Sequence, residues 1–181
     1  MIFWGYLTMS QTNNLIVLCV ECNEKAKTDS IYLSEIIRRY YVLDNKTTIR
    51  YVYLGTKTKY NHSKTIKSIK NIIKNAESAH IIYCIDTDEI SSDPDTIKLN
   101  EKIKEFCEQN SFQLCWFCRD IEEVMMHKQV HDNEKAKTAR TFKTNDKLNK
   151  ATKDTLSAKD PMHKYCSNIL LILDEFLNRH K

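Results

Sequence analysis

The sequence predicts an α/β fold, in which a parallel β-sheet of about four strands is flanked by helices. Two observations lead to this prediction. Short, continuous runs of apolar and β-branched residues are typical of strands that are buried on both faces of a sheet. Between these runs lie segments whose apolar residues recur with helical spacing. Strands and helices that alternate in this way form right-handed βαβ units of a doubly wound sheet, and a length of 181 residues corresponds to one domain.

Four apolar runs predict the strands. They are residues Leu15–Val20, Thr48–Leu54, His80–Ile85 and Phe112–Phe117. Amphipathic segments predict four helices between and after these strands, because their apolar side chains fall on one face. They are residues Ser30–Tyr41, Ser63–Lys74, Asp95–Gln109 and Arg119–Met126.

The ends of the chain differ from this alternating part. Residues 1–14 are expected to be a leader, with disorder as one option, and residues 15–181 a single domain. In residues 128–164 the apolar periodicity stops and Lys, Thr, Asn and Asp dominate, which predicts a long Lys-rich loop. Residues 165–180 regain a helical apolar pattern. We therefore expect a closing helix that packs back on the sheet.

The composition excludes several classes of protein. The chain has only two glycines, and the phosphate-binding loops of Walker and dinucleotide-binding proteins need several. Seven cysteines, an odd number that lies mostly in apolar runs, indicate reduced thiols and not a secreted disulfide framework. No segment reaches the ~20 apolar residues of a membrane helix. We therefore expect a cytoplasmic protein without a membrane partner.

Acidic side chains follow two of the predicted strands at the point where each strand ends. Glu21 comes directly after the first strand, and Asp86 and Asp88 follow the third. Ligands of open α/β sheets bind at this edge, and alternation in an extended segment places Asp86 and Asp88 on the same side. Three neighbouring carboxylates repel one another unless a cation lies among them, and Mg²⁺ prefers such oxygen ligands. The pattern predicts a Mg²⁺ (or Mn²⁺) site, although helix caps and solvated loop residues also follow strands.

Charge is distributed unevenly along the chain, although the formal net charge is only +4. Residues 46–74 contain eight basic and no acidic side chains, residues 86–123 contain eleven acidic and four basic ones, and residues 128–164 contain ten basic and five acidic ones. Basic segments on both sides of an acidic centre suit a nucleic-acid backbone, although solvated lysines explain the pattern as well. Tyr60 and His62 are candidates for base stacking. The lysines expected to contact nucleic acid are Lys64, Lys67, Lys70 and Lys74.

Four segments resemble a known family. They are Val20–Leu33, where Glu21 is followed by Thr28-Asp29 and a helix with Tyr32, then Ile85–Asp88 with its D-x-D pattern, Phe117–Met126, and Pro161–Phe176 with Ser167-Asn168-Ile169. In this order they resemble Toprim-like proteins of the RloB and OLD type, over most of the chain. The resemblance implies a Toprim-like, that is Rossmann-like, sheet with a C-terminal helix packed back on it. The chain departs from the family at Cys22, where the family has Gly.

The resemblance also implies a function. Toprim-like proteins of this type carry out magnesium-dependent phosphodiester chemistry on nucleic acid, and RloB-like members are tied to antiviral (phage) defence. Carried over, Glu21 is the general acid or base, Asp86 and Asp88 bind the metal together with Glu21, and Glu122 is a possible additional acid. The chain is then a nuclease or a related phosphoryl-transfer enzyme. The alternative, motivated by Cys22, is a catalytically silent module that binds nucleic acid or a partner ATPase; a homo-oligomer is compatible with both.

Two further patterns have metal-ligand spacing. Cys19/Cys22 and Cys115/Cys118 are C-x-x-C pairs, which suggests a structural zinc site as a third hypothesis. The pairs lie far apart in the sequence and inside strands, so packing of buried thiols explains them better. A histidine pair, His127/His131, has the i, i+4 spacing of helical metal ligands, but surface histidines explain it equally simply.

Overall fold

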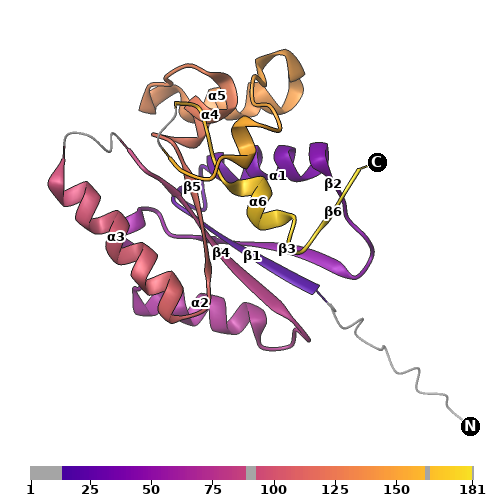
Figure 1. Cartoon of the computed structure of the whole chain (residues 1–181), viewed down its shortest axis with the longest axis vertical. Helices are drawn as coiled ribbons and strands as arrows, with labels where there is room; N and C mark the ends of the chain where they lie inside the picture. Colours follow the sequence, from indigo (N-terminus) through magenta and orange to yellow (C-terminus); the bar gives the residue numbers. More distant parts are fainter. Residues whose placement is uncertain (1–13, 89–92, 162–163, 181) are drawn as a thin grey trace, which may run out of the picture.

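The fold is a four-stranded parallel sheet flanked by helices, as the apolar runs predict (Figure 1). The computed structural model describes residues 14–88, 93–161 and 164–180. The strand order is β3-β1-β4-β5, and all three pairings are parallel. The strands are β1 (Asn14–Val20), β3 (Thr47–Tyr53), β4 (Ala79–Asp86) and β5 (Gln113–Phe117). The α/β, Rossmann-like class predicted from the sequence is confirmed.

Helices cover both faces of the sheet. Four helices lie on one face, namely α1 (Thr28–Tyr40), α4 (Ile121–Met126), α5 (Asp132–Thr144) and α6 (Ile169–Leu173). Two lie on the other face, namely α2 (Ser63–Ile73) and α3 (Pro94–Gln109). The remaining elements are the 3₁₀ turns η1 (Lys57–Lys59), η2 (Asp146–Leu148) and η3 (Thr155–Ser157), and a small antiparallel pair of β2 (Tyr41–Val42) with β6 (Asn178–Arg179).

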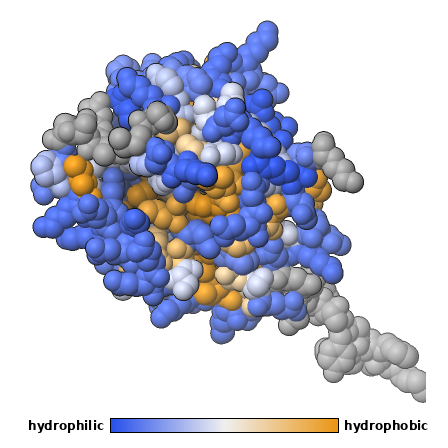
Figure 2. All heavy atoms as spheres, in the orientation of Figure 1, coloured by the Kyte–Doolittle hydropathy of each residue, from blue (hydrophilic) through white to orange (hydrophobic). Residues whose placement is uncertain are grey.

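The central strand β1 shows why an uninterrupted apolar run forms here. Alternate side chains of a strand point to opposite faces. Ile16 and Leu18 pack under α1 and its neighbours, whereas Val17 and Cys19 pack under α2 and α3. Full burial of such a side chain stabilises the fold by about 1.5–3 kcal/mol. Figure 2 shows one side of the molecule, where apolar side chains are visible in the middle and mostly hydrophilic side chains lie above and below them. The strand ends are thus held by a core on each side.

The segment 128–164, predicted to be a loop, contains α5, η2 and η3. The prediction is wrong because α5 has few apolar side chains, and so it lacks the repeating apolar pattern by which a helix is recognised in the sequence. Ala139 and Phe142 are its buried residues, and the Phe142 ring meets the Tyr32 ring of α1 edge-on, with centroids 4.8 Å apart. Two apolar residues are too few to give a recognisable period, so the contact with α1 decides the structure.

The closing helix predicted for residues 165–180 is shorter in the structure. It packs back against β5 as expected, but α6 spans only Ile169–Leu173, and the chain then turns into β6. Tertiary hydrogen bonds replace helical ones at both ends. The Asn168 side chain accepts from the Trp116 backbone N (2.9 Å) and donates to the Leu114 carbonyl (3.0 Å). After the helix, the Asp174 carboxylate accepts from the Tyr41 hydroxyl at 2.9 Å.

The strand order creates a switch point between β1 and β4. From β1 the chain crosses first to β3 on one side, and then returns to β4 on the other side. In such sheets a crevice forms at the carboxyl ends of the two strands where the order reverses. The predicted leader, apart from Asn14, lies outside the described residues. Within residues 14–88, 93–161 and 164–180, no helix is both long and apolar enough to cross a membrane.

Candidate functional site

Two of the predicted acids meet at the switch point. Glu21 directly follows β1, and Asp86 is the last residue of the adjacent strand β4. A Glu21 carboxylate oxygen (Oε1) accepts a hydrogen bond from the backbone N of Asp86 at 2.7 Å. The carboxylate of Asp86 accepts in turn from the backbone N of Ile121, at the start of α4, at 3.1 Å. Both side chains are thus held by backbone groups, which places them side by side at the sheet edge.

Burial makes the charged forms of these carboxyls unfavourable. It raises the pKa of Glu21 from 4.5 to about 7, and the repulsion of Asp88 and Asp29 adds to this effect while Lys57 opposes it. The pKa of Asp86 is raised well above its usual value, first by burial and then by the charges of Glu21 and Asp29. The cluster therefore carries more carboxylates than its surroundings neutralise. It gains stability from either protons or a cation.

Asp88 has a different environment from Asp86. The Nζ of Lys57 contacts the Asp88 carboxylate and donates to the Asp86 carbonyl at 2.7 Å. Lys57 is buried, whereas the Asp88 side chain is 55% exposed. The backbone of Asp88 lies in the left-handed region (φ 56°), so the segment is not extended there. The expectation that strand alternation orients Asp88 like Asp86 is therefore wrong.

Glu122 belongs to the same acidic cluster, as the sequence suggested. It lies in the first turn of α4 and is buried, and its charge contributes to the raised pKa of Asp86. Burial raises the pKa of Glu122 itself to about 7, against the attraction of Lys135. Its Oε2 lies 3.4 Å from the Lys135 Nζ, and its Oε1 is buried with no hydrogen-bond partner among the described residues.

Sequence reasoning missed several members of the cluster. Asp29 accepts a hydrogen bond from the Cys22 backbone N at 2.9 Å, and it raises the pKa of Glu21. Asp120 caps α4 and lies 3.6 Å from Lys135. The strand-end rule could have found Asp120, which follows β5 closely. No local signal distinguishes Lys57 or Lys135 from the many other lysines.

Of the three acids predicted to bind a divalent cation, Glu21 and Asp86 have no lysine partner among the described salt bridges, whereas Asp88 has one. Glu21 and Asp86 offer hard oxygen ligands, and Mg²⁺ is commonly bound by one or two carboxylates together with water. Asp88 is engaged by Lys57. Accordingly, the described part of the chain holds no group of three His, Cys, Asp or Glu side chains arranged for a metal ion. The residues that would hold the metal are Glu21 and Asp86.

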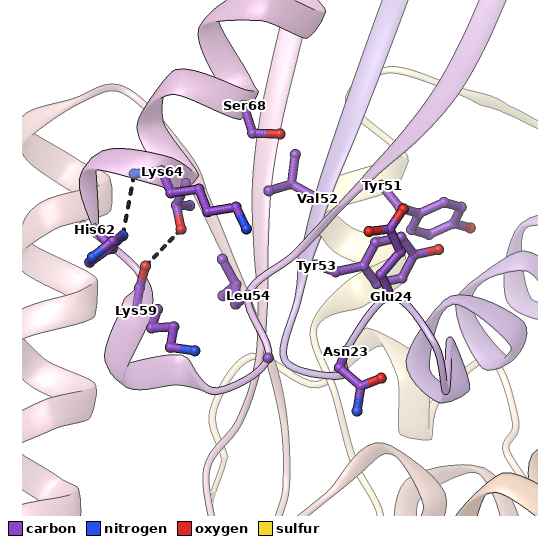
Figure 3. A pocket seen from close by; sticks show the side chains of 12 residues that line it. Asn23, Glu24, Tyr51, Val52, Tyr53, Leu54, Lys59, His62, Lys64 and Ser68 are labelled. Carbon is purple, nitrogen blue, oxygen red and sulfur yellow. Dashed lines mark hydrogen bonds between the residues drawn. The ribbon is translucent and has the colours of Figure 1, made fainter.

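A cavity of about 440 Å³ lies at the free edge of β3 (Figure 3). Lys64 is one of its lining residues. The other lysines predicted to contact nucleic acid, Lys67, Lys70 and Lys74, are exposed and do not line it. The full lining consists of Asn23, Glu24, Tyr51, Val52, Tyr53, Leu54, Gly55, Lys59, His62, Lys64, Thr65 and Ser68.

The cysteine and histidine pairs do not form metal sites in the described structure. Cys19 packs in the core under α2 and α3, whereas Cys115 packs in the core on the other face of the sheet. All seven thiols are free, and all but Cys22 are buried. His127 ends α4 with a left-handed backbone, and His131 precedes α5, so no single helix presents both rings. The zinc hypothesis is therefore wrong for the paired cysteines.

Comparison of the chain with family models, with curated proteins and with solved structures gave no match. Its function therefore has to be inferred from the side chains at the switch point and along the edge of β3. These two regions share their connections to the sheet, since the segment after β1 and the segment after β3 contribute residues to both.

Proposed function

We propose that the protein is a Mg²⁺- or Mn²⁺-dependent nuclease, or a related phosphoryl-transfer enzyme, that acts on nucleic acid. The observation that carries the proposal is the pair Glu21 and Asp86, two half-buried carboxyls with raised pKa values at the ends of adjacent strands at the switch point. Glu21 and Asp86 would hold a divalent cation, which would offset their repulsion and supply charge neutralisation at a phosphate and activation of water. The resemblance of the segments around both residues to Toprim-like proteins supports the same reading.

The side chains suggest a division of roles. Asp86 serves as a metal ligand, because its carboxylate is fixed by the Ile121 backbone N. Glu21 serves as a ligand and as the general acid or base. Both roles are those that the resemblance implies for this position, and the Asp86 backbone N orients the Glu21 carboxylate. Glu122 is the additional acid, whose charge acts on Asp86 and whose carboxylate lies next to Lys135.

A cleavage assay tests the proposal. Labelled single-stranded and duplex DNA and RNA are incubated with the protein in Mg²⁺, in Mn²⁺ and in EDTA. We expect cleavage only with a divalent cation, and a loss of about 100-fold or more in Asp86→Asn. The matched control is Asp95→Asn, which neutralises an exposed carboxylate in the first turn of α3 and should retain the wild-type rate. Equal cleavage in EDTA, or by Asp86→Asn, would contradict the proposal.

A second candidate function is a silent module that binds nucleic acid or a partner ATPase without cutting. The contact of Lys57 with Asp88 and with the Asp86 carbonyl favours it, because an ammonium group already supplies positive charge next to the acids. If this second function is correct, titration of Mn²⁺ in a calorimeter should give the same heat for the wild type and for Asp86→Asn. Nucleic acid is then bound but not cleaved with any cation.

A further inference from the structure

The cavity at the edge of β3 has the dimensions of a small-ligand site. Its volume of about 440 Å³ falls within the range of about 300–1,000 Å³ typical of such pockets. It lies between the segment that follows β1, the edge strand β3 and the beginning of α2 (Figure 3). Among the described strands β3 pairs only with β1, so its outer edge is open. A space of this size admits one nucleotide but not a double helix.

One side of the cavity is basic. Lys59 and Lys64 extend their side chains into it, with His62 beside them (Figure 3). Neither lysine forms an ion pair with any described residue, and Glu24 is the only acid in the lining. The backbone that carries these lysines is held in place. The His62 ring accepts from the Lys64 backbone N (3.3 Å), and the Thr65 hydroxyl donates to the Lys59 carbonyl (3.0 Å).

The opposite side of the cavity is aromatic. Tyr51 and Tyr53 are neighbours on the same face of β3, with ring centroids 6.3 Å apart and ring planes at 27°. Their hydroxyls are held by α1, since that of Tyr51 lies 2.9 Å from the Ser34 hydroxyl and that of Tyr53 donates to Ser30 at 3.4 Å. These bonds fix the rings, which are half-buried. A basic groove with fixed aromatic rings is the combination that binds single-stranded nucleic acid.

The chain segments that line the cavity also carry members of the acidic cluster. The Gly55 backbone N donates to the Cys22 carbonyl at 3.3 Å, which ties the segment after β3 to the segment after β1. Lys57, between Gly55 and Lys59, reaches the Asp86 carbonyl. The segment after β3 thus contributes both to the cavity, through Gly55 and Lys59, and to the acidic cluster, through Lys57.

We propose that this cavity is a subsite for one nucleotide of a single-stranded polynucleotide, DNA or RNA, in which Lys59 and Lys64 bind phosphate and Tyr53 stacks on the base. The position of this nucleotide next to the scissile phosphate rests on the proposed nuclease function. Binding of the strand in the cavity does not, because it needs no metal.

The test measures binding in EDTA, where no cleavage interferes. The anisotropy of a fluorescein-labelled single strand of about ten nucleotides, as DNA and as RNA, is compared with that of the matching duplex. We expect the Lys59→Ala/Lys64→Ala double variant to weaken single-strand binding about tenfold or more. It should also reduce the slope of log K against log salt by about 1.4, since each phosphate contact on a single strand contributes about 0.7.

Two controls separate this subsite from general attraction. Lys70→Ala/Lys74→Ala removes the same charge outside the cavity, from the last turn of α2 and the residue that follows it, and it should weaken binding less than about threefold. Tyr53→Leu keeps an apolar side chain but loses the stacking face, and it should cost about tenfold. Tyr53→Phe keeps the ring and should bind like the wild type. Circular dichroism and thermal melting confirm that each variant is folded.

Three outcomes would overturn the subsite: equal losses in the two double lysine variants, unchanged binding by Tyr53→Leu, or tighter binding of the duplex than of the single strand. If Tyr53→Leu unfolds, a 5′-phosphorylated dinucleotide is titrated into the wild-type protein instead, and backbone NMR shifts are followed. The subsite predicts shift changes at Gly55, Lys59 and Thr65. No change at these residues would refute it. Loss of EDTA binding in the cavity variants, with no cation-dependent cleavage by the wild type, supports the subsite and refutes the nuclease. Cation-dependent cleavage by the wild type, with unchanged binding in the cavity variants, would support the nuclease and refute the subsite.

Discussion

The acidic cluster and the basic cavity are built on neighbouring strands of the same parallel sheet, but they differ in how far their charged groups are exposed to water. The carboxyls of Glu21 and Asp86 are half-buried and held by backbone N–H groups, and desolvation raises their pKa values. The ammonium groups of Lys59 and Lys64 are exposed and held only through their backbone. Desolvation therefore disfavours the charged carboxylates of the cluster, whereas water solvates the ammonium groups in the cavity. The net charge of +4 conceals this separation.

The largest expected effect separates the two regions by function. Asp86→Asn should lower cation-dependent cleavage about 100-fold or more while leaving oligonucleotide binding in EDTA within about twofold of the wild type. The Lys59→Ala/Lys64→Ala variant should show the reverse order of effects, with a larger loss of binding than of cleavage at saturating substrate. Parallel losses of both properties in both variants would show that the regions do not act separately.

Lys57 connects the two regions, and its removal should destabilise the fold. Lys57→Met leaves the Asp86 carbonyl and the Asp88 carboxylate without their donor, so we expect a loss of about 1–3 kcal/mol in unfolding free energy by urea titration at pH 8. Since Lys57 also lowers the pKa of Glu21, that pKa should rise above about 7 in the variant. Lys59→Met is the control, and because Lys59 is exposed it should change stability by less than about 0.5 kcal/mol. Equal effects of the two variants would contradict the assigned role of Lys57.

Glu21 should make stability depend on pH. Its pKa is about 7 in the folded protein and 4.5 ordinarily, so the folded state holds the proton more tightly. The resulting stabilisation is complete below pH 4.5 and is lost as the pH rises through 7. We therefore compare the unfolding free energy of Glu21→Gln with that of the wild type at pH 5 and at pH 8. Between these two pH values the difference should shift in favour of the variant by on the order of 1 kcal/mol. A difference independent of pH in urea titrations would refute the raised pKa.

The smallest effect is expected on α2 beyond the cavity. Lys74→Ala removes one exposed charge near the end of the helix, so single-strand binding in EDTA should fall by less than about twofold. Lys64→Ala, the same substitution inside the cavity, should cost more. An equal loss in both would mean that the whole basic segment attracts nucleic acid uniformly.

Much of the fold was predictable because it depends on local patterns. The apolar run His80–Ile85 predicted β4, which spans Ala79–Asp86, since a strand covered on both faces needs apolar residues at every position. The helix α5 was not predictable in the same way. Its buried residues Ala139 and Phe142 gain their meaning only from α1, with which α5 packs.

The candidate site divides in the same manner. The positions of Glu21 and Asp86 at the ends of apolar runs sufficed to predict that they meet, because parallel strands end at one edge. The engagement of Asp88 by Lys57 depends on a left-handed backbone and on a lysine far away in the sequence, so no local pattern predicts it.

The sequence by itself therefore determined the class of the fold, the edge of the sheet that carries the acids and the uneven distribution of charge. All three follow from the order of residues along the chain. Only the tertiary structure decided which charges are buried and which lysine meets which acid. It also decided that Tyr51 and Tyr53 face a cavity at the edge of β3. Those features arise from packing between distant segments, and desolvation there sets the energies on which the proposed chemistry depends.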